Sequence, residues 1–180
     1  QHPTHGNFVA GVILYGDELS DKKWIAGEKI KIYDAAIIPD FSLCQLEEDE
    51  LLFRLRKAVE DHPWIKIWNL AISIRVAVDL ERISEFGLLL DYLQEKYDII
   101  ICKSCGNGEF TKDKEEKGSI LQGSDTIRSL VIASCNQEGE VSSFSLSGKG
   151  HKILEKPDIA MYGGDVFWDA NGKRKVAGVY

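Results

Sequence analysis

The stretch LERISEFGLLLDYLQEKYDIIIC, Leu80 to Cys102, decides the fold class. Up to Lys96 its apolar residues recur at the spacing of one helix face. The residues of that face are Ile83, Phe86, Leu89, Leu90 and Leu93. Asp98 to Cys102 then forms an uninterrupted apolar run, which predicts a short buried strand. A helix followed closely by a fully apolar strand is typical of a parallel sheet covered by helices.

The same order of elements precedes this stretch. Trp64 to Ile72, WIKIWNLAI, predicts a strand because it alternates and then runs apolar. Glu48 to Glu60 predicts a helix, since its leucines have helical spacing and its acidic residues precede its basic ones. Lys29 to Ile38, KIKIYDAAII, predicts another strand that ends at Pro39. Alternating strands and helices predict an α/β fold with a mostly parallel sheet.

The remaining segments are less regular. Phe8 to Tyr15, FVAGVILY, is apolar almost all round and fits either a buried helix or a strand. Gly106 to Gly118 predicts a charged, glycine-rich loop, and Ile127 to Ala133 predicts a further strand. Val141 to Phe144 predicts a shorter strand, whereas the glycine-rich segment from Gly148 to Tyr180 is predicted to be irregular.

The composition narrows the classes of function. The 180 residues fit a single domain, and the net charge is -7 with 22 scattered Lys and Arg residues, which argues against a nucleic-acid partner. No apolar run near the length of a membrane span occurs, and residues 1 to 20 do not resemble a signal peptide. Four cysteines lie in apolar or strand-like segments without framework spacing. We therefore expect a soluble, cytoplasmic protein with reduced thiols.

Cys102 and Cys105 form a Cys-x-x-Cys pair, which suggests a metal or redox site. A zinc ribbon needs a second pair, but Cys44 and Cys135 are single residues. A thioredoxin-like motif needs its first cysteine at the start of a helix, whereas Cys102 ends a predicted strand. The pattern therefore favours small buried thiols and no metal or other cofactor. A metal or redox module remains an alternative that predicts bound zinc or a titrating dithiol.

The position of SCGN, Ser104 to Asn107, is more informative than its thiol. In an open parallel sheet, ligands bind beyond the carboxyl ends of the strands, and this segment follows a predicted strand. SCGN resembles the Ala-Ala-Gly-Asn strand end of the subtilisin-like serine proteases, the subtilases of peptidase family S8. THGNFVAGVILYG resembles the family's segment around the catalytic histidine, and WNLAIS resembles a strand end that lines its substrate cleft. EVSSFSLSGKG and EKPDIAMYGGD resemble two later family motifs, and all five occur in the family's order.

The resemblance implies a three-layer α/β/α fold with a mostly parallel, subtilisin-like sheet. It implies that His5 is the catalytic imidazole and opens a buried helix through Phe8 to Tyr15. It also implies that the Asn107 side chain donates into the oxyanion hole. A polypeptide substrate would pair as an added strand along a cleft. The substrate-binding residues implied by the resemblance are Asn69, Ala71, Ile72, Ser73, Ser104, Cys105 and Gly106.

Some of these residues also fit plainer interpretations. Asn107 lies between two glycines and fits a turn residue with positive φ. The residues from Asn69 to Ser73 fit the start of a loop. Lys156 and Asp158, on either side of a proline, are expected to position the backbone and to do no chemistry.

The chain also departs from the family pattern. Ala71 and Ser73 stand where the family cleft has Ser and Gly. Met161 and Tyr162 stand where the family has Ala-Pro, and Asn7 and Phe8 where it has Thr-His. These departures put the edges of the substrate cleft in question.

A subtilase triad runs Asp, His, Ser along the chain, and neither an Asp strand before His5 nor a Gly-Thr-Ser motif is found in these residues. The resemblance therefore implies a central fragment, residues 1–180, that lacks the first strands and the Ser helix and is inert alone. The alternative is a pseudoprotease module that binds extended peptides. Since the family's Asp strand lies between the strands matching Lys29 to Ile38 and Trp64 to Ile72, we expect these two to close together or a homodimer to cover them.

Overall fold

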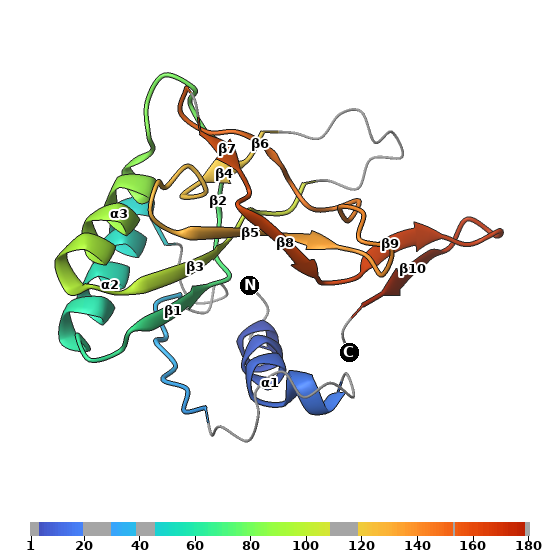
Figure 1. Ribbon diagram of the computed structural model, residues 1–180, viewed down its shortest axis with the longest axis horizontal. Helices are drawn as coiled ribbons and strands as arrows, with labels where there is room; N and C mark the ends of the chain where they lie inside the picture. Colours follow the sequence, from blue (N-terminus) through green and yellow to red (C-terminus); the bar gives the residue numbers. More distant parts are fainter. Residues whose placement is uncertain (1–3, 20–29, 39–45, 109–118, 153, 179–180) are drawn as a thin grey trace. The chain divides into compact units, whose positions relative to one another are not determined.

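The computed structural model describes residues 4–19, 30–38, 46–108, 119–152 and 154–178 (Figure 1). The chain divides into two compact units, Gln1–Ala58 and Val59–Gly178. Every described strand belongs to the second unit. The predicted site residues are divided accordingly, with His5 in the first unit and the others in the second.

Helix α1, Thr4–Leu19, contains the FVAGVILY segment, so the helix implied by the family resemblance is confirmed. Its expected burial is wrong for the described residues. Phe8, Leu14 and Tyr15 are exposed, and Gly16 is buried. A sequence that is apolar all round is suited to burial on every side, but this pattern alone does not supply the elements that would cover it.

Residues 30–38 do not form the strand predicted from KIKIYDAAII. They are in no sheet with the described strands, and Ile30, Ile32 and Tyr33 are exposed. The Ile37 amide donates to the Ala35 carbonyl at 2.8 Å, which bends the chain locally. Alternation predicts the faces of a strand, but a strand also needs a neighbour to pair with. This segment is not paired with the described strands, and the expectation of closure or of a covering homodimer stays a prediction.

Helix α2, Glu48–Asp61, agrees with the predicted helix. Its first turn carries three acidic residues, which the partial positive charge of a helix N-terminus favours. Glu50 also pairs with Arg54 one turn later, at 2.7 Å. One stripe of the helix is buried, and its residues are Leu51, Leu55 and Val59.

A four-stranded parallel sheet forms the centre of the second unit, as predicted. Its strands are β1 (Ile67–Leu70), β3 (Ile100–Ser104), β5 (Leu130–Cys135) and β8 (Ile159–Tyr162). Their order in the sheet is β1-β3-β5-β8. All four carboxyl ends consequently lie along one edge of the sheet, where a parallel sheet binds ligands.

The sheet buries one face more fully than the other. Ile67 and Ile100 are exposed, and they alternate along their strands with buried residues. The buried set is Trp68, Leu70, Ile101, Lys103, Val131 and Ala133. Helix α3, Glu85–Tyr97, contacts β3, beside which it lies in Figure 1. It buries Phe86, Leu89, Leu90 and Leu93, as its helical spacing predicts.

Helix α3 begins at Glu85 and not at Leu80 because Ser84 caps it. The Ser84 hydroxyl accepts a hydrogen bond from the Gly87 amide at 3.0 Å, which satisfies one of the free donors of the first turn. The helix ends at Asp98, whose φ of 50° is left-handed. The predicted strand therefore begins at Ile100 and extends to Ser104.

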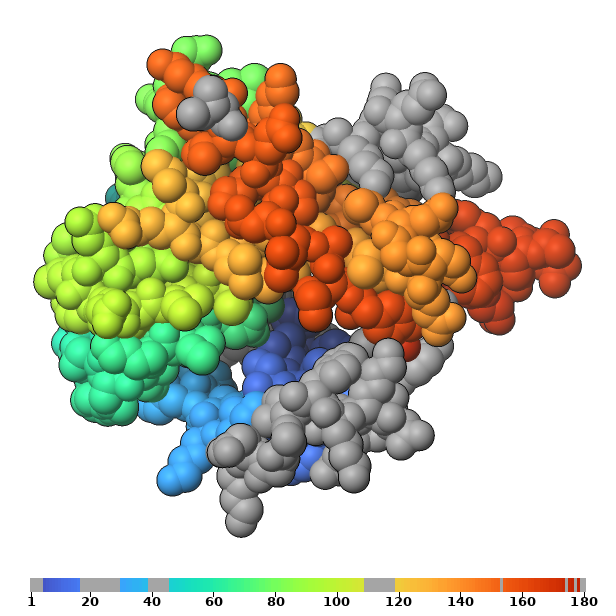
Figure 2. Space-filling model, viewed as in Figure 1, coloured from blue at the N-terminus to red at the C-terminus, as the bar shows by residue number. Residues whose placement is uncertain are grey.

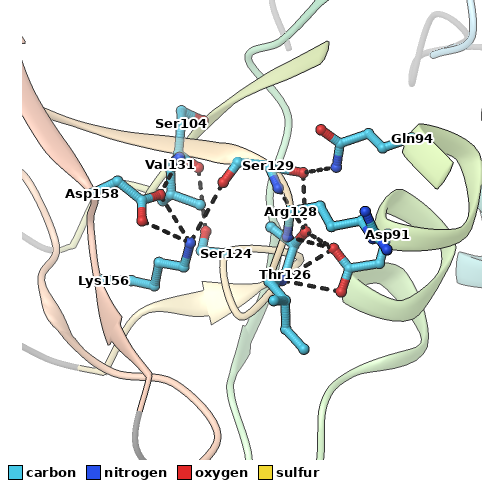
Figure 3. A network of polar contacts seen from close by, with 11 residues as sticks. Asp91, Gln94, Ser104, Ser124, Thr126, Arg128, Ser129, Val131, Lys156 and Asp158 are labelled. Atoms are coloured by element: carbon cyan, nitrogen blue, oxygen red, sulfur yellow. Dashed lines mark hydrogen bonds and ion pairs between the residues drawn. The ribbon is translucent and has the colours of Figure 1, made fainter. Parts of the chain in front are cut away.

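Strand β5 begins three residues later than predicted, at Leu130 and not at Ile127, because Asp91 of α3 holds the preceding residues (Figure 3). The Asp91 carboxylate accepts hydrogen bonds from the Thr126 hydroxyl and from the amides of Ile127 and Arg128. The Ile127 and Arg128 amides are therefore unavailable for hydrogen bonds to a neighbouring strand. A turn replaces the predicted first part of the strand.

The predicted strand from Val141 to Phe144 is wrong. Val141 forms one isolated bridge with Cys135, and the Ser145 amide then donates to the Ser142 carbonyl at 3.0 Å. That bond closes a turn. Two of its four residues are serines, whose hydroxyls donate to the Gly164 and Val166 carbonyls and so compete with a regular strand ladder.

The prediction of an irregular C-terminal segment is also wrong. It contains β8 and four further strands: β6 (Gly148–Lys149), β7 (Glu155–Lys156), β9 (Asp165–Trp168) and β10 (Arg174–Ala177). Strands β9 and β10 form an antiparallel hairpin that projects from the second unit (Figures 1 and 2). Gly172, with φ of 72°, lies in its turn, so this glycine connects two strands and does not mark irregular structure.

Candidate active site

The ends of β1 and β3 bring most of the predicted site residues together. We call this set the strand-end site: Asn69, Ala71, Ile72 and Ser73 from β1 onward, with Ser104, Cys105, Gly106 and Asn107 from β3 onward. The β1–β3 ladder pairs Asn69 with Cys102 and ends with Leu70 opposite Lys103. Beyond that pair the two segments continue as neighbouring strand ends, as the fold class predicts.

Asn107 is held through the backbone on both sides. It forms an antiparallel bridge with Ser145. The Gly108 amide donates to the Phe144 carbonyl at 2.9 Å, and the Leu146 amide donates to the Gly106 carbonyl at 3.2 Å. Two motifs that lie far apart in the sequence, SCGN and SSFSLSG, are therefore joined at this point.

The Asn107 side chain is exposed, and no described residue forms a hydrogen bond with its side-chain amide group. Its φ is not positive, so the turn interpretation of this residue is wrong. Gly106 takes the left-handed conformation instead, with φ of 96°. A Cβ atom on Gly106 would lie 2.9 Å from the Leu121 side chain, so a larger residue would also force that side chain to move. The backbone that carries the Asn107 side chain is therefore held in place, and its side-chain amide is accessible to a ligand.

Cys105, the residue before Gly106, is almost completely buried. Its amide donates to the Ile132 carbonyl at 3.0 Å, and its Sγ atom lies 3.3 Å from the Ser145 hydroxyl. Burial raises the pKa of both the Cys102 and the Cys105 thiols. A raised pKa is the opposite of what an activated redox thiol requires. The described residues also contain no group of three or more His, Cys, Asp or Glu side chains suited to a metal ion.

The other side of the strand-end site is supported by a second, two-stranded sheet. Strand β2, Ile74–Ala77, follows Ser73 directly and pairs with β4, Leu121–Gln122. Leu121 of β4 also packs on Gly106. The same short strand therefore contacts both segments of the site.

Lys103 is a part of this region that sequence reasoning missed. Its side chain is completely buried, at 0% exposure. Its ammonium donates to the Ser104 carbonyl at 2.6 Å and to the Ser73 hydroxyl at 3.2 Å. It also lies 5.9 Å from the centre of the Phe86 ring. The signal was a lysine in an otherwise apolar strand, since lysine is almost never fully buried unless it is paired.

The charge of Lys103 is poorly compensated. Burial lowers its pKa from 10.5 to about 8, although Cys105 and Asp125 act in the opposite direction. Among the described residues no carboxylate forms an ion pair with it; Asp125 instead accepts hydrogen bonds from the Ser84 amide, the Ser84 hydroxyl and the Gly123 amide. A buried ammonium of this kind is costly to the fold.

The Ser104 carbonyl receives a second hydrogen bond, from the Ser124 hydroxyl at 3.2 Å (Figure 3). Ser124 belongs to the loop whose next residues are held by Asp91 of α3. The orientation of this carbonyl is thus set by Lys103 on its own strand and by a loop anchored on a helix.

His5 lies in the first turn of α1 and is exposed. The family resemblance is the only basis for its catalytic role. Asn69 is exposed on β1, and Ala71, Ile72 and Ser73 are each half-buried.

The sequence profile of the Subtilase family, peptidase S8, matches residues 1–179. The chain belongs to the subtilase family. The match includes every residue of the strand-end site and His5. The subtilase assignment agrees with the parallel sheet and its helices.

Solved structures with a partly similar fold include three proteases. The prenylagaramide maturation protease PagA is 16% identical, with a TM-score of 0.49 over 74% of this subtilase chain and 44% of its own. The patellamide maturation protease PatA is 14% identical, with a TM-score of 0.46 over 71% and 44%. The epidermin leader peptide processing serine protease EpiP from Staphylococcus aureus is 16% identical, with a TM-score of 0.45 over 71% and 40%. The chain thus spans less than half of each.

No curated protein matches this subtilase chain. Among the described residues, no helix has the length and apolar character needed to cross a membrane.

Proposed function

We propose that these 180 residues are part of a subtilisin-like serine endopeptidase that hydrolyses peptide bonds. The observation that carries the proposal is the geometry of Asn107, an exposed amide on a backbone held by the Ser145 bridge. As the attacked carbonyl becomes an oxyanion, a donor that is already oriented stabilises the transition state more than the substrate.

His5 is proposed as the general base that takes the proton of the catalytic serine and returns it to the leaving amine. In this proposal the serine and the aspartate of the triad come from sequence outside these 180 residues. The 180-residue chain alone then hydrolyses no peptides, because an imidazole and an oxyanion donor without a nucleophile leave no covalent route.

The strand-end site is proposed to bind the substrate as an extended strand. Asn69, Ala71, Ile72 and Ser73 would line one side, and Ser104, Cys105 and Gly106 the other. Main-chain pairing supplies affinity in this mode of recognition, which suits the departures at Ala71 and Ser73 because backbone contacts depend little on side chains. The free thiols of Cys102, Cys105 and Cys135 support a reducing, cytoplasmic location as part of this proposal.

Fluorophosphonate labelling of the full-length protein tests the proposal. The wild type should label, and His5→Ala should not, because an unactivated serine reacts poorly with the probe. His62→Ala is the matched control and should label like the wild type. His62 packs edge-on against Trp64, with the two ring centroids 5.2 Å apart, and it is not one of the proposed site residues. Folded wild-type protein that does not label would contradict the endopeptidase and leave a non-catalytic peptide-binding module.

A further inference from the structure

The buried ammonium of Lys103 links the two sides of the strand-end site. The β1–β3 ladder ends at the pair Leu70 and Lys103, so the sheet itself no longer fixes the spacing beyond this point. Lys103 reaches forward from that last pair. Its Nζ atom binds the Ser73 hydroxyl on one side and the Ser104 carbonyl on the other, at 3.2 Å and 2.6 Å.

In the proposed binding mode, the extended peptide lies between these two segments and contacts both. Its binding therefore depends on the separation and orientation of the two segments to within a fraction of an ångström. Ser73 and Ser104 are the positions at which Lys103 acts on them. We infer that Lys103 is a positioning residue of the peptide site, which holds Ser73 and the Ser104 carbonyl in the arrangement that binds substrate. This inference rests on the proposed function, because it takes the strand-end site to be where peptide binds.

The surroundings of Lys103 fit a functional requirement better than a structural one. A buried lysine that only supported the fold would be expected to have a carboxylate partner. The charged and titratable groups that act on Lys103 are Cys105, on the continuation of its own strand, and Asp125, in the loop after β4. Neither forms an ion pair with it in the described chain. An apolar side chain would fill this space at lower cost but would not link Ser73 to Ser104.

The test measures binding of fluorescein-labelled casein by fluorescence anisotropy. It uses the full-length protein with His5→Ala as a non-cleaving background, and adds Lys103→Met, Ser73→Ala and both together. At pH 7 we expect Lys103→Met to weaken binding about tenfold, the usual effect of losing one charge-assisted hydrogen bond. Ser73→Ala should weaken it in the same direction. The double variant should bind no more weakly than Lys103→Met, because both changes remove one link.

Two readouts separate positioning from general structural damage. In the background protein, binding should weaken as the pH rises past about 8, where Lys103 loses its proton; with Lys103→Met this pH dependence should vanish. Lys156→Met is the matched control, because Lys156 is also buried but pairs with Asp158. It should leave the binding constant and its pH dependence unchanged.

Folded Lys103→Met protein that binds casein like the background would overturn the inference. If that variant does not fold, unchanged binding by Ser73→Ala overturns it, as does absence of casein binding by every form. Binding that depends on Lys103 in a protein that never cleaves casein with His5 restored supports the inference and refutes the endopeptidase. If the protein with His5 restored cleaves casein but Lys103→Met does not change binding, the endopeptidase is supported and the inference about Lys103 is refuted.

Discussion

The two lysines buried in the described chain, Lys103 and Lys156, have opposite surroundings. Lys156 is 5% exposed, and its ammonium lies 2.8 Å and 3.0 Å from the carboxylate oxygens of Asp158. Asp158 in turn accepts the Val131 amide at 2.7 Å, which ties β5 to the segment before β8 (Figure 3). Lys103 is more deeply buried and bonds only to a carbonyl and a hydroxyl among the described residues.

This difference separates a structural charge from one that the fold tolerates at a cost. Lys156 and Asp158 position the backbone between two strands, as the sequence predicts. Lys103 lies near the carboxyl end of its strand, the side of a parallel sheet where ligands bind, and its compensation is incomplete. A protein retains a local weakness of this kind mainly at a functional site.

The largest expected change in stability comes from removing the carboxylate partner of Lys156, which leaves it, like Lys103, without an ion pair. Asp158→Ala removes the carboxylate, leaves the buried ammonium with the Ser129 carbonyl at 3.4 Å but no anion, and deprives the Val131 amide of its acceptor. We expect the free energy of unfolding to fall by about 3 kcal/mol, the low end for breaking a buried pair, because the Asp158 side chain is 36% exposed. Urea unfolding measures this. A loss no larger than that of a surface substitution would remove the contrast between the two lysines.

The next effect is on how the free energy of unfolding changes with pH, to which Lys103 should make its own contribution. Its pKa is about 8 in the folded chain and near 10.5 in the unfolded chain, so the unfolded state holds more protons between these values. Stability from this group therefore rises with pH across that window, by up to about 3 kcal/mol. Urea unfolding from pH 7.5 to 10 should give a smaller rise, or a steeper fall, for Lys103→Met than for the wild type. Parallel curves would contradict the lowered pKa.

A smaller effect is expected from Lys103→Met at pH 7. Removing an uncompensated buried charge is favourable, while losing its two hydrogen bonds is unfavourable, so we expect a net stabilisation of about 1 kcal/mol. Lys156→Met should destabilise the protein, because it leaves Asp158 unpaired. The midpoints of thermal unfolding for the two variants should therefore move in opposite directions. Equal destabilisation of both would make Lys103 a structural residue like Lys156.

The parallel sheet and helices α2 and α3 were predictable because their signals are local and repeated. Leu89, Leu90 and Leu93 mark a helix face whatever the rest of the chain does. The strand over Lys29 to Ile38 was not predictable in the same way. Its alternation is as regular as that of Trp64 to Ile72, but the described strands offer it no partner, and a partner is a property of the fold and not of the segment.

For the candidate site, sequence motifs singled out Asn107 and the segment around Ser145, but they could not predict the backbone bridge between the two. The role of Lys103 was also beyond sequence reasoning, because its partner Ser73 lies 30 residues earlier, in the segment between β1 and β2. Boundaries failed where side chains compete with the backbone. Asp91 delays β5, and Ser84 delays α3, through hydrogen bonds that only the folded chain brings together.

The most direct test of the account is the kcat of the full-length protein with Asn107→Ala, measured beside Asn171→Ala on the exposed turn of the β9–β10 hairpin. If Asn107 donates to the oxyanion, its replacement should lower kcat by about 10²–10³ while KM changes little, because the bond forms only in the transition state. Asn171→Ala should behave like the wild type. An Asn107→Ala protein with wild-type kcat would contradict the proposal that this strand end stabilises the reaction.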